Sequence, residues 1–130
     1  MTPVDRPEHV VKMLDHAFNN GDLEAVLAFY EEAAALVAGP TTILRGRAQL
    51  SAFFESVLQS GSHAKQLKVR VIESGEIALF LSRWTLIPKG STATRSGQEF
   101  FATTVMRKQP DGSWKVLIDN PIGPAALESS

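Results

Sequence analysis

The spacing of apolar residues changes from a helical to a strand period near the middle of the chain, and this change restricts the fold most. Apolar side chains within residues 7–58 recur every three or four positions, as on one face of an α-helix. From residue 67 onward they alternate with polar side chains, as in a strand with one buried face. Helices followed by neighbouring strands are typical of an α+β domain.

Three helices are expected in the first half. The first runs from Pro7, a residue suited to a first helical turn, to the Asn20-Gly21 stop signal. The second follows the capping residue Asp22 and runs to Tyr30, and residues 33–37 either extend it or begin a strand. After a brief strand over 41–44, the third helix spans 46–59.

The second half predicts an antiparallel sheet. Strands are expected over residues 67–71, 77–87, 98–108 and 114–118, with hairpin turns at 73–76 and 110–112 and a mobile loop over 88–97. On the strand 77–87, we expect Ala78, Phe80, Ser82 and Trp84 to face inward. Three helices of this length can cover only one face of such a sheet. We therefore expect a second copy of the chain on the other face, which makes a homodimer.

Composition excludes several classes of protein. The 130 residues suit one domain over 1–130, with its core at about 7–122. The net charge of -1 argues against nucleic-acid binding, and the absence of cysteine excludes thiol nucleophiles and cysteine-ligated metals. No signal peptide or membrane span is evident, so we expect a cytoplasmic protein that does not bind membranes.

Four stretches resemble the nuclear transport factor 2-like superfamily, in its ketosteroid isomerase-like and SnoaL-like polyketide cyclase-like branch. They are Phe18–Tyr30, Gly46–Phe54, Gly75–Leu79 and Arg107–Asp119, and their order and spacing carry the resemblance. The resemblance implies a cystatin-like fold, in which a cone-shaped, curved antiparallel β-sheet is capped by three N-terminal helices. It also implies an internal pocket, and dimerisation through the outer sheet face is common in this superfamily.

The catalytic residues of the steroid isomerases are missing at the matching positions. Leu14 stands where those enzymes have a tyrosine, Ala38 where they have the aspartate base, and Thr104 where they have a second acid. Their chemistry needs a base beside the carbon acid and donors at the enolate oxygen. We therefore do not expect steroid isomerase activity.

Two other carboxylates are candidate catalytic residues. Glu99 enters an apolar strand, where a buried acid with a raised pKa is a candidate base. Its alternative is an exposed charge paired with Arg83 or Arg95. Asp119 ends the last strand, where the cone of this superfamily usually opens. Its alternative is an ordinary strand exit, because such side chains bond the nearby backbone.

The remaining candidates would contact a ligand rather than react with it. They combine aromatic rings expected in the cone with short polar side chains near its opening: Tyr30, Phe54, Phe80, Trp84, Thr103 and Asn120. For most of them, core packing is the alternative interpretation. His9 and His16 are about 10 Å apart along a helix, too far to share a metal ion, so we expect no metal site and no cofactor.

Two functions follow from these patterns. The first is binding of a small, mostly apolar molecule in an internal pocket, with isomerase, cyclase or hydrolase chemistry left open. The second is a non-catalytic homodimeric association or accessory module, which predicts a cone filled by phenylalanine side chains. The sequence does not decide whether the protein is an enzyme.

Overall fold

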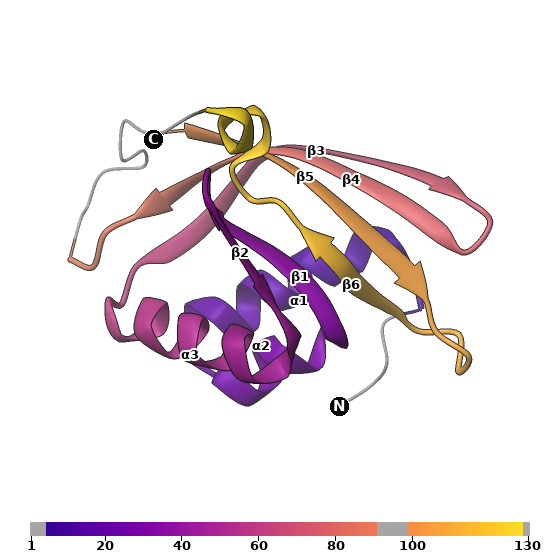
Figure 1. Cartoon of the computed structure of the whole chain (residues 1–130), viewed down its shortest axis with the longest axis horizontal. Helices are drawn as coiled ribbons and strands as arrows, with labels where there is room; N and C mark the ends of the chain where they lie inside the picture. Colours follow the sequence, from indigo (N-terminus) through magenta and orange to yellow (C-terminus); the bar gives the residue numbers. More distant parts are fainter. Residues whose placement is uncertain (1–4, 91–98, 129–130) are drawn as a thin grey trace.

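A computed structural model describes residues 5–90 and 99–128 (Figure 1). The helices are α1 (Pro7–Asn19), α2 (Leu23–Ala28) and α3 (Gly46–Gln59), with a final 3-10 helix, η1 (Gly123–Leu127). The strands are β1 (Tyr30–Gly39), β2 (Thr42–Arg45), β3 (His63–Ser74), β4 (Ile77–Ile87), β5 (Glu99–Lys108) and β6 (Trp114–Asp119). Most of the loop predicted over 88–97, and Arg95 with it, lies outside the described residues.

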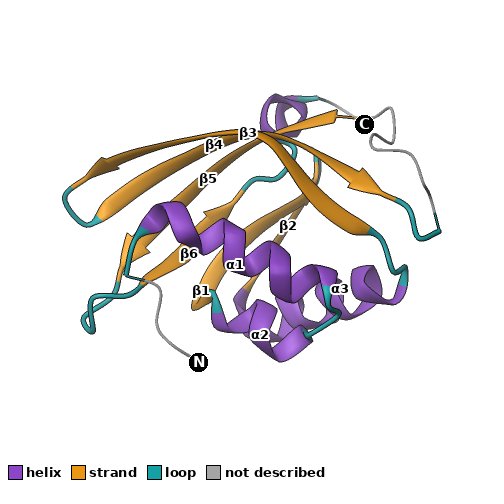
Figure 2. Ribbon diagram, turned by 180° about the vertical axis from the view of Figure 1, so that it is seen from behind, coloured by secondary structure: helices purple, strands orange, loops and turns teal. Residues whose placement is uncertain are grey.

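The six strands form one curved, open sheet in the order β2-β1-β6-β5-β4-β3. Helices α1, α2 and α3 lie together against one face of this sheet (Figures 1 and 2). The predicted α+β cone with three N-terminal helices is therefore confirmed. The sheet is mixed rather than wholly antiparallel, because β1 runs parallel to β6.

Strand β1 replaces the last turn of the helix predicted over 22–30. Helix α2 ends at Ala28, and Tyr30 already belongs to a strand paired with both β2 and β6. Pairing with two neighbours and burial of Tyr30, Ala34 and Leu36 override the local helical spacing. Arg47 of α3 holds this junction, because its guanidinium donates to the carbonyl oxygens of Leu27 and Tyr30.

A β-bulge changes the alternation of side chains along β3. Gln66 pairs with Trp84, whereas Lys68 pairs with Arg83, so the register shifts between the two pairs. One extra residue in a strand moves the following side chains to the opposite phase. The bulge thereby places Gln66 on the same face as Trp84, although simple alternation puts Gln66 with Lys68 and Arg70.

The core lies between the helices and the inner face of the sheet. Ala78 and Phe80 of β4 are almost fully buried there, with Met106 of β5 and Val10 of α1. The inward face of β4 is therefore the one that the sequence predicts. Among the described residues, no helix is long and apolar enough to cross a membrane. The cytoplasmic location stays a prediction.

Candidate functional site

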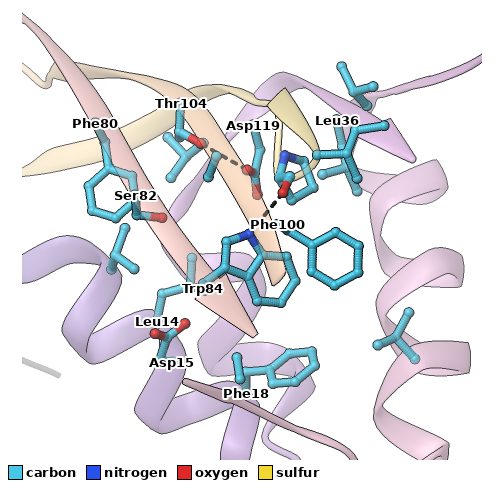
Figure 3. A pocket seen from close by; sticks show the side chains of 18 of the residues that line it. Leu14, Asp15, Phe18, Leu36, Phe80, Ser82, Trp84, Phe100, Thr104 and Asp119 are labelled. Carbon is cyan, nitrogen blue, oxygen red and sulfur yellow. Dashed lines mark hydrogen bonds between the residues drawn. The ribbon is translucent and has the colours of Figure 1, made fainter. Parts of the chain in front are cut away.

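A cavity of about 350 Å³ opens between the inner sheet face and the helices α1 and α3. Its wall is mainly apolar, and Leu14 and Phe18 of α1 face Phe80 and Trp84 of β4 across it (Figure 3). The curvature of the sheet, together with helices on one side only, leaves this space unfilled. The cone is therefore roomy, contrary to the filled cone that the association hypothesis predicts.

Aromatic rings form one side of the cavity. Trp84 stacks on Phe100 with ring centroids 4.9 Å apart, and Phe53 meets Phe54 edge to face at 5.4 Å. The indole Nε1 of Trp84 donates to the carbonyl oxygen of Pro121 at 2.8 Å (Figure 3). This bond fixes the indole, so that a flat, rigid surface faces the cavity.

The first polar feature is the Asp119 network, made of Asp119, Tyr30 and Thr104. The Tyr30 hydroxyl donates to Oδ2 of Asp119 at 2.5 Å. The Thr104 hydroxyl donates to Oδ1 of the same carboxylate at 3.1 Å (Figure 3). Burial raises the pKa of Asp119, while the two hydroxyl donors act in the opposite direction. Burial, and then the neighbouring Asp119 carboxylate, raise the pKa of Tyr30 well above its usual value.

The second polar feature is the Asp15 pair, made of Asp15 on α1 and Gln66 on β3. The Gln66 side chain donates from Nε2 to Oδ2 of Asp15 at 3.0 Å. Burial raises the pKa of Asp15 to about 6, the bond from Gln66 opposes this, and Asp119 adds to it. The cavity thus holds two carboxylates that favour their protonated forms more than exposed acids do.

Two polar atoms at the cavity have no hydrogen-bond partner among the described residues. They are Oε1 of Gln66 and Oγ of Ser82, and both are buried. Ser82 is only 7% exposed. A buried polar atom without a partner costs free energy, so such atoms are rare and often face a bound molecule or an ordered water.

The structure brings five of the predicted site residues to the cavity: Tyr30, Phe54, Phe80, Trp84 and Asp119. Their roles stay predictions. Tyr30 is buried with its hydroxyl bonded inside, whereas core rings more often leave the hydroxyl at the surface.

The other three candidates do not line the cavity. Glu99 lies at the start of β5 with its carboxylate 3.7 Å from Arg83, as in the alternative interpretation. Thr103 points to the outer face, because Thr104 beside it points inward. The Asn120 amide donates to the Thr103 hydroxyl and to the carbonyl oxygen of Gly123, so it fixes the exit from β6.

The positions that match the steroid isomerase residues do line the cavity. Leu14, Ala38 and Thr104 all contribute to its wall. Leu14 and Ala38 carry no polar side-chain atom, and Thr104 donates to Asp119. The two carboxylates of this cavity, Asp15 and Asp119, therefore lie at other positions than the three matched ones.

Sequence reasoning missed Asp15 and Gln66. Asp15 falls on the apolar stripe of α1, four residues after Val11 and three before Phe18, so a carboxylate among cavity-facing apolar residues was the available signal. Gln66 gave no such signal, because the bulge that turns it inward has no clear sequence signature. Among the described residues, no group of three or more histidine, aspartate or glutamate side chains could hold a metal ion.

The curved sheet, the three helices and the cavity between them define the class of nuclear transport factor 2-like (NTF2-like), cystatin-like folds. A model of the SnoaL-like domain matches residues 10–117. The chain therefore belongs to the SnoaL-like domain family, as the sequence motifs predict. No curated protein matches the sequence.

Solved structures share this fold at low sequence identity. A proposed dehydratase of the NTF2-like family from Streptomyces avermitilis has a TM-score of 0.76 at 20% identity, covering 90% of this chain and 92% of that one. A proposed calcium/calmodulin-dependent protein kinase type II association domain from Thiobacillus denitrificans has a TM-score of 0.75 at 19% identity, covering 93% and 98%. A cystatin-like protein of unknown function from Nostoc punctiforme has a TM-score of 0.74 at 20% identity, covering 87% and 84%.

Proposed function

We propose that the protein binds a small, mostly apolar molecule in the cavity and that Asp119 exchanges a proton with it. The observation that carries this proposal is a buried carboxylate, oriented by two hydroxyl donors, in the wall of an open and mainly apolar cavity. A proton-transfer group needs a fixed position and a pKa moved toward neutrality, and Asp119 has both. Isomerase, cyclase and hydrolase reactions, and the dehydration named for the Streptomyces protein, all use such a group.

Two experiments test binding and chemistry separately. Native mass spectrometry of freshly purified protein should reveal an extra small mass that is lost on denaturation. Leu14→Trp fills the cavity and should abolish this mass, whereas Met13→Trp, at an exposed position of the same helix, should retain it. With the ligand identified, Asp119→Asn should keep binding but lose turnover. Retained turnover would remove Asp119 as the catalytic residue.

We further propose that two copies associate through the outer face of the sheet. Ile72, Leu79, Val105 and Ile118 are paired in one row across β3, β4, β5 and β6. Three of them are exposed large apolar side chains, and Phe101 on the same face is 55% exposed. An apolar row of this length on a solvent-facing sheet is typical of a protein interface.

Sedimentation velocity tests this association. The wild-type chain should sediment as a dimer at micromolar concentration. Leu79→Asp places a charge in the centre of the row and should give a monomer, whereas Ser56→Asp adds the same charge at an exposed position of α3, on the other side of the sheet, and should leave the dimer intact. A monomeric wild-type chain would contradict the proposal. A pure association function is the less favoured alternative, because it leaves the cavity and its two carboxylates without a role.

A further inference from the structure

The unpartnered polar atoms of the cavity accept hydrogen bonds rather than only donate them. Gln66 Oε1 is an acceptor, Ser82 Oγ can accept, and the carboxylate of Asp15 has further lone pairs beyond the one that Gln66 occupies. Among the described residues that line the cavity, Gln66 is the one donor to Asp15. A ligand that completes this site must therefore supply hydrogen-bond donors.

The cavity also contains negative charge, and none of its described lining residues is a cation. Its titratable groups, among the described lining residues, are Asp15 on α1, Tyr30 on β1 and Asp119 on β6, and no lysine, arginine or histidine is among them. Burying a carboxylate without a cation is costly, and this cost is the main reason why Asp15 holds its proton up to a pH of about 6. A positively charged ligand would remove that cost, and an anionic ligand would increase it.

We infer that the ligand is an amine. Its ammonium group binds Asp15, Gln66 and Ser82, and its hydrocarbon part packs on the aromatic rings that form one side of the cavity. This inference rests on the proposed function of the cavity and specifies the chemical class of its ligand. Asp119 stays available for proton transfer, because each of its oxygens is already oriented by a hydroxyl donor.

An ammonium group matches the site in number, charge and surroundings. It carries three donors and no acceptor, and the site offers three acceptor groups. Its bond to a carboxylate is charge-assisted and stronger than a bond between neutral groups. The aromatic rings of Trp84, Phe18 and Phe80 line the same cavity, and the face of an aromatic ring attracts a cation. An alcohol supplies a single donor and leaves two of the acceptors without a partner.

Three probes that differ only in their end group test the inference. They are 2-(2-naphthyl)ethylamine, 2-(2-naphthyl)ethanol and the carboxylate 2-naphthaleneacetate. Binding is measured by calorimetric titration at pH 7.5. Above pH 6 Asp15 is ionised, and the amine remains protonated, as a lysine does. We expect the amine to bind at least about tenfold more tightly than the alcohol, since hydrogen bonds to charged groups are the stronger ones. The acetate should not bind measurably.

Two variants assign the preference to the site. Asp15→Asn keeps the shape of the side chain but loses its charge, so it should bind amine and alcohol with similar affinity. Ser82→Ala should weaken the amine several-fold and leave the alcohol unchanged. Glu55→Gln, an exposed position on α3, is the matched control for the loss of one negative charge and should behave as wild type. Circular dichroism and thermal melting check that each variant folds.

The pH dependence gives a second readout. Because the amine binds ionised Asp15, its affinity should be constant above pH 6 and fall by about tenfold per pH unit below it. Asp15→Asn should abolish this fall, which separates Asp15 from Asp119. Equal affinity of the alcohol and the amine for the wild type would overturn the amine inference while leaving the cavity as a binding site. If none of the probes binds, and native mass spectra show no bound mass, the proposed function fails as well.

Discussion

The two carboxylates of the cavity are partnered in opposite ways. Asp119 lies on β6 and accepts hydrogen bonds from two hydroxyl groups on two other strands. Asp15 lies on a helix, is only partly buried, and receives one bond from an amide whose own oxygen has no partner among the described residues. The Asp119 network is completed by the protein itself, whereas the Asp15 pair leaves acceptors open to a ligand.

This difference separates two ways in which a fold can hold an acid. An acid that the protein supplies with donors has a fixed orientation before any ligand arrives, which suits proton transfer. An acid that lacks donors raises the free energy of the empty site and regains it on binding. Variants that remove a donor of the Asp119 network should therefore lower the free energy of unfolding, whereas removal of the Asp15 charge should raise it.

The largest expected effect comes from Tyr30→Phe. It removes the donor to Oδ2 of a buried carboxylate, so we expect the free energy of unfolding to fall by about 2–3 kcal/mol. The corresponding change in the other region, Gln66→Met, should cost less than about 1 kcal/mol, because it also removes the unpartnered Oε1. Urea denaturation measures both. Equal losses would show that the two acids do not differ as described.

Asp15→Asn should stabilise the protein at high pH. The pKa of Asp15 is about 6 in the folded chain and about 3.9 in an unfolded one, so the folded state binds the proton more tightly. The contribution of Asp15 to stability is therefore present below pH 4 and is lost as the pH rises to 6. The loss is at most about 3 kcal/mol, and we expect about 1–2 kcal/mol because water reaches part of the side chain.

Thermal melts at pH 4 and pH 8 check this sign. The melting temperatures of Asp15→Asn and wild type should agree at pH 4, and the variant should melt higher at pH 8. A variant that is less stable at pH 8 would mean that ionised Asp15 is well satisfied without a ligand. The contrast with the Asp119 network would then disappear.

Thr104→Val removes the second donor of the Asp119 network without changing the shape of the side chain. We expect a loss of about 1 kcal/mol, less than for Tyr30→Phe, because the longer bond of 3.1 Å contributes less than the one at 2.5 Å. In the double variant with Tyr30→Phe, the loss in the free energy of unfolding should differ from the sum of the two single losses, since both hydroxyls bind one carboxylate. Strict additivity in urea denaturation would argue against a shared network.

Glu99→Gln is expected to have the smallest effect. The side chain lies outside the cavity, and its contact with Arg83 is 3.7 Å long and partly exposed. Ion pairs of this kind contribute about 0–1 kcal/mol, so we expect a change below about 0.5 kcal/mol and unchanged probe binding. A large loss of binding would restore Glu99 as a site residue.

The sequence predicts the parts of the fold that depend on local patterns. Helix α3 and strand β4 have the predicted bounds, because apolar spacing and the flanking turns agree there. The end predicted for the second helix, at Tyr30, was wrong. The spacing of Leu23, Val26, Leu27 and Tyr30 is helical, and only the pairing of Tyr30 with β6, more than eighty residues away, makes it a strand residue. Long-range pairing has no local signature.

The site was predicted less completely than the fold. Asp119 and the rings of Phe80 and Trp84 could be placed because they follow from strand phase and from the position of a strand end, whereas Tyr30 was expected at the end of a helix. Asp15 was detectable, because its carboxylate falls on the apolar stripe of α1. Gln66 could not be found, since its inward orientation depends on a register shift.

The β-bulge after Gln66 holds one residue, Leu67, that has no partner in β4. Removing the single codon of Leu67 would restore regular alternation between β3 and β4, with Gln66 still opposite Trp84 and Lys68 still opposite Arg83, so no side chain would change face. The aromatic rings and Asp119 belong to other helices and strands and would be untouched by this step. The chain can thus lose one residue at this point and keep an acceptor-rich cavity, which is a short evolutionary route by which relatives with this fold can differ in length without diverging in ligand.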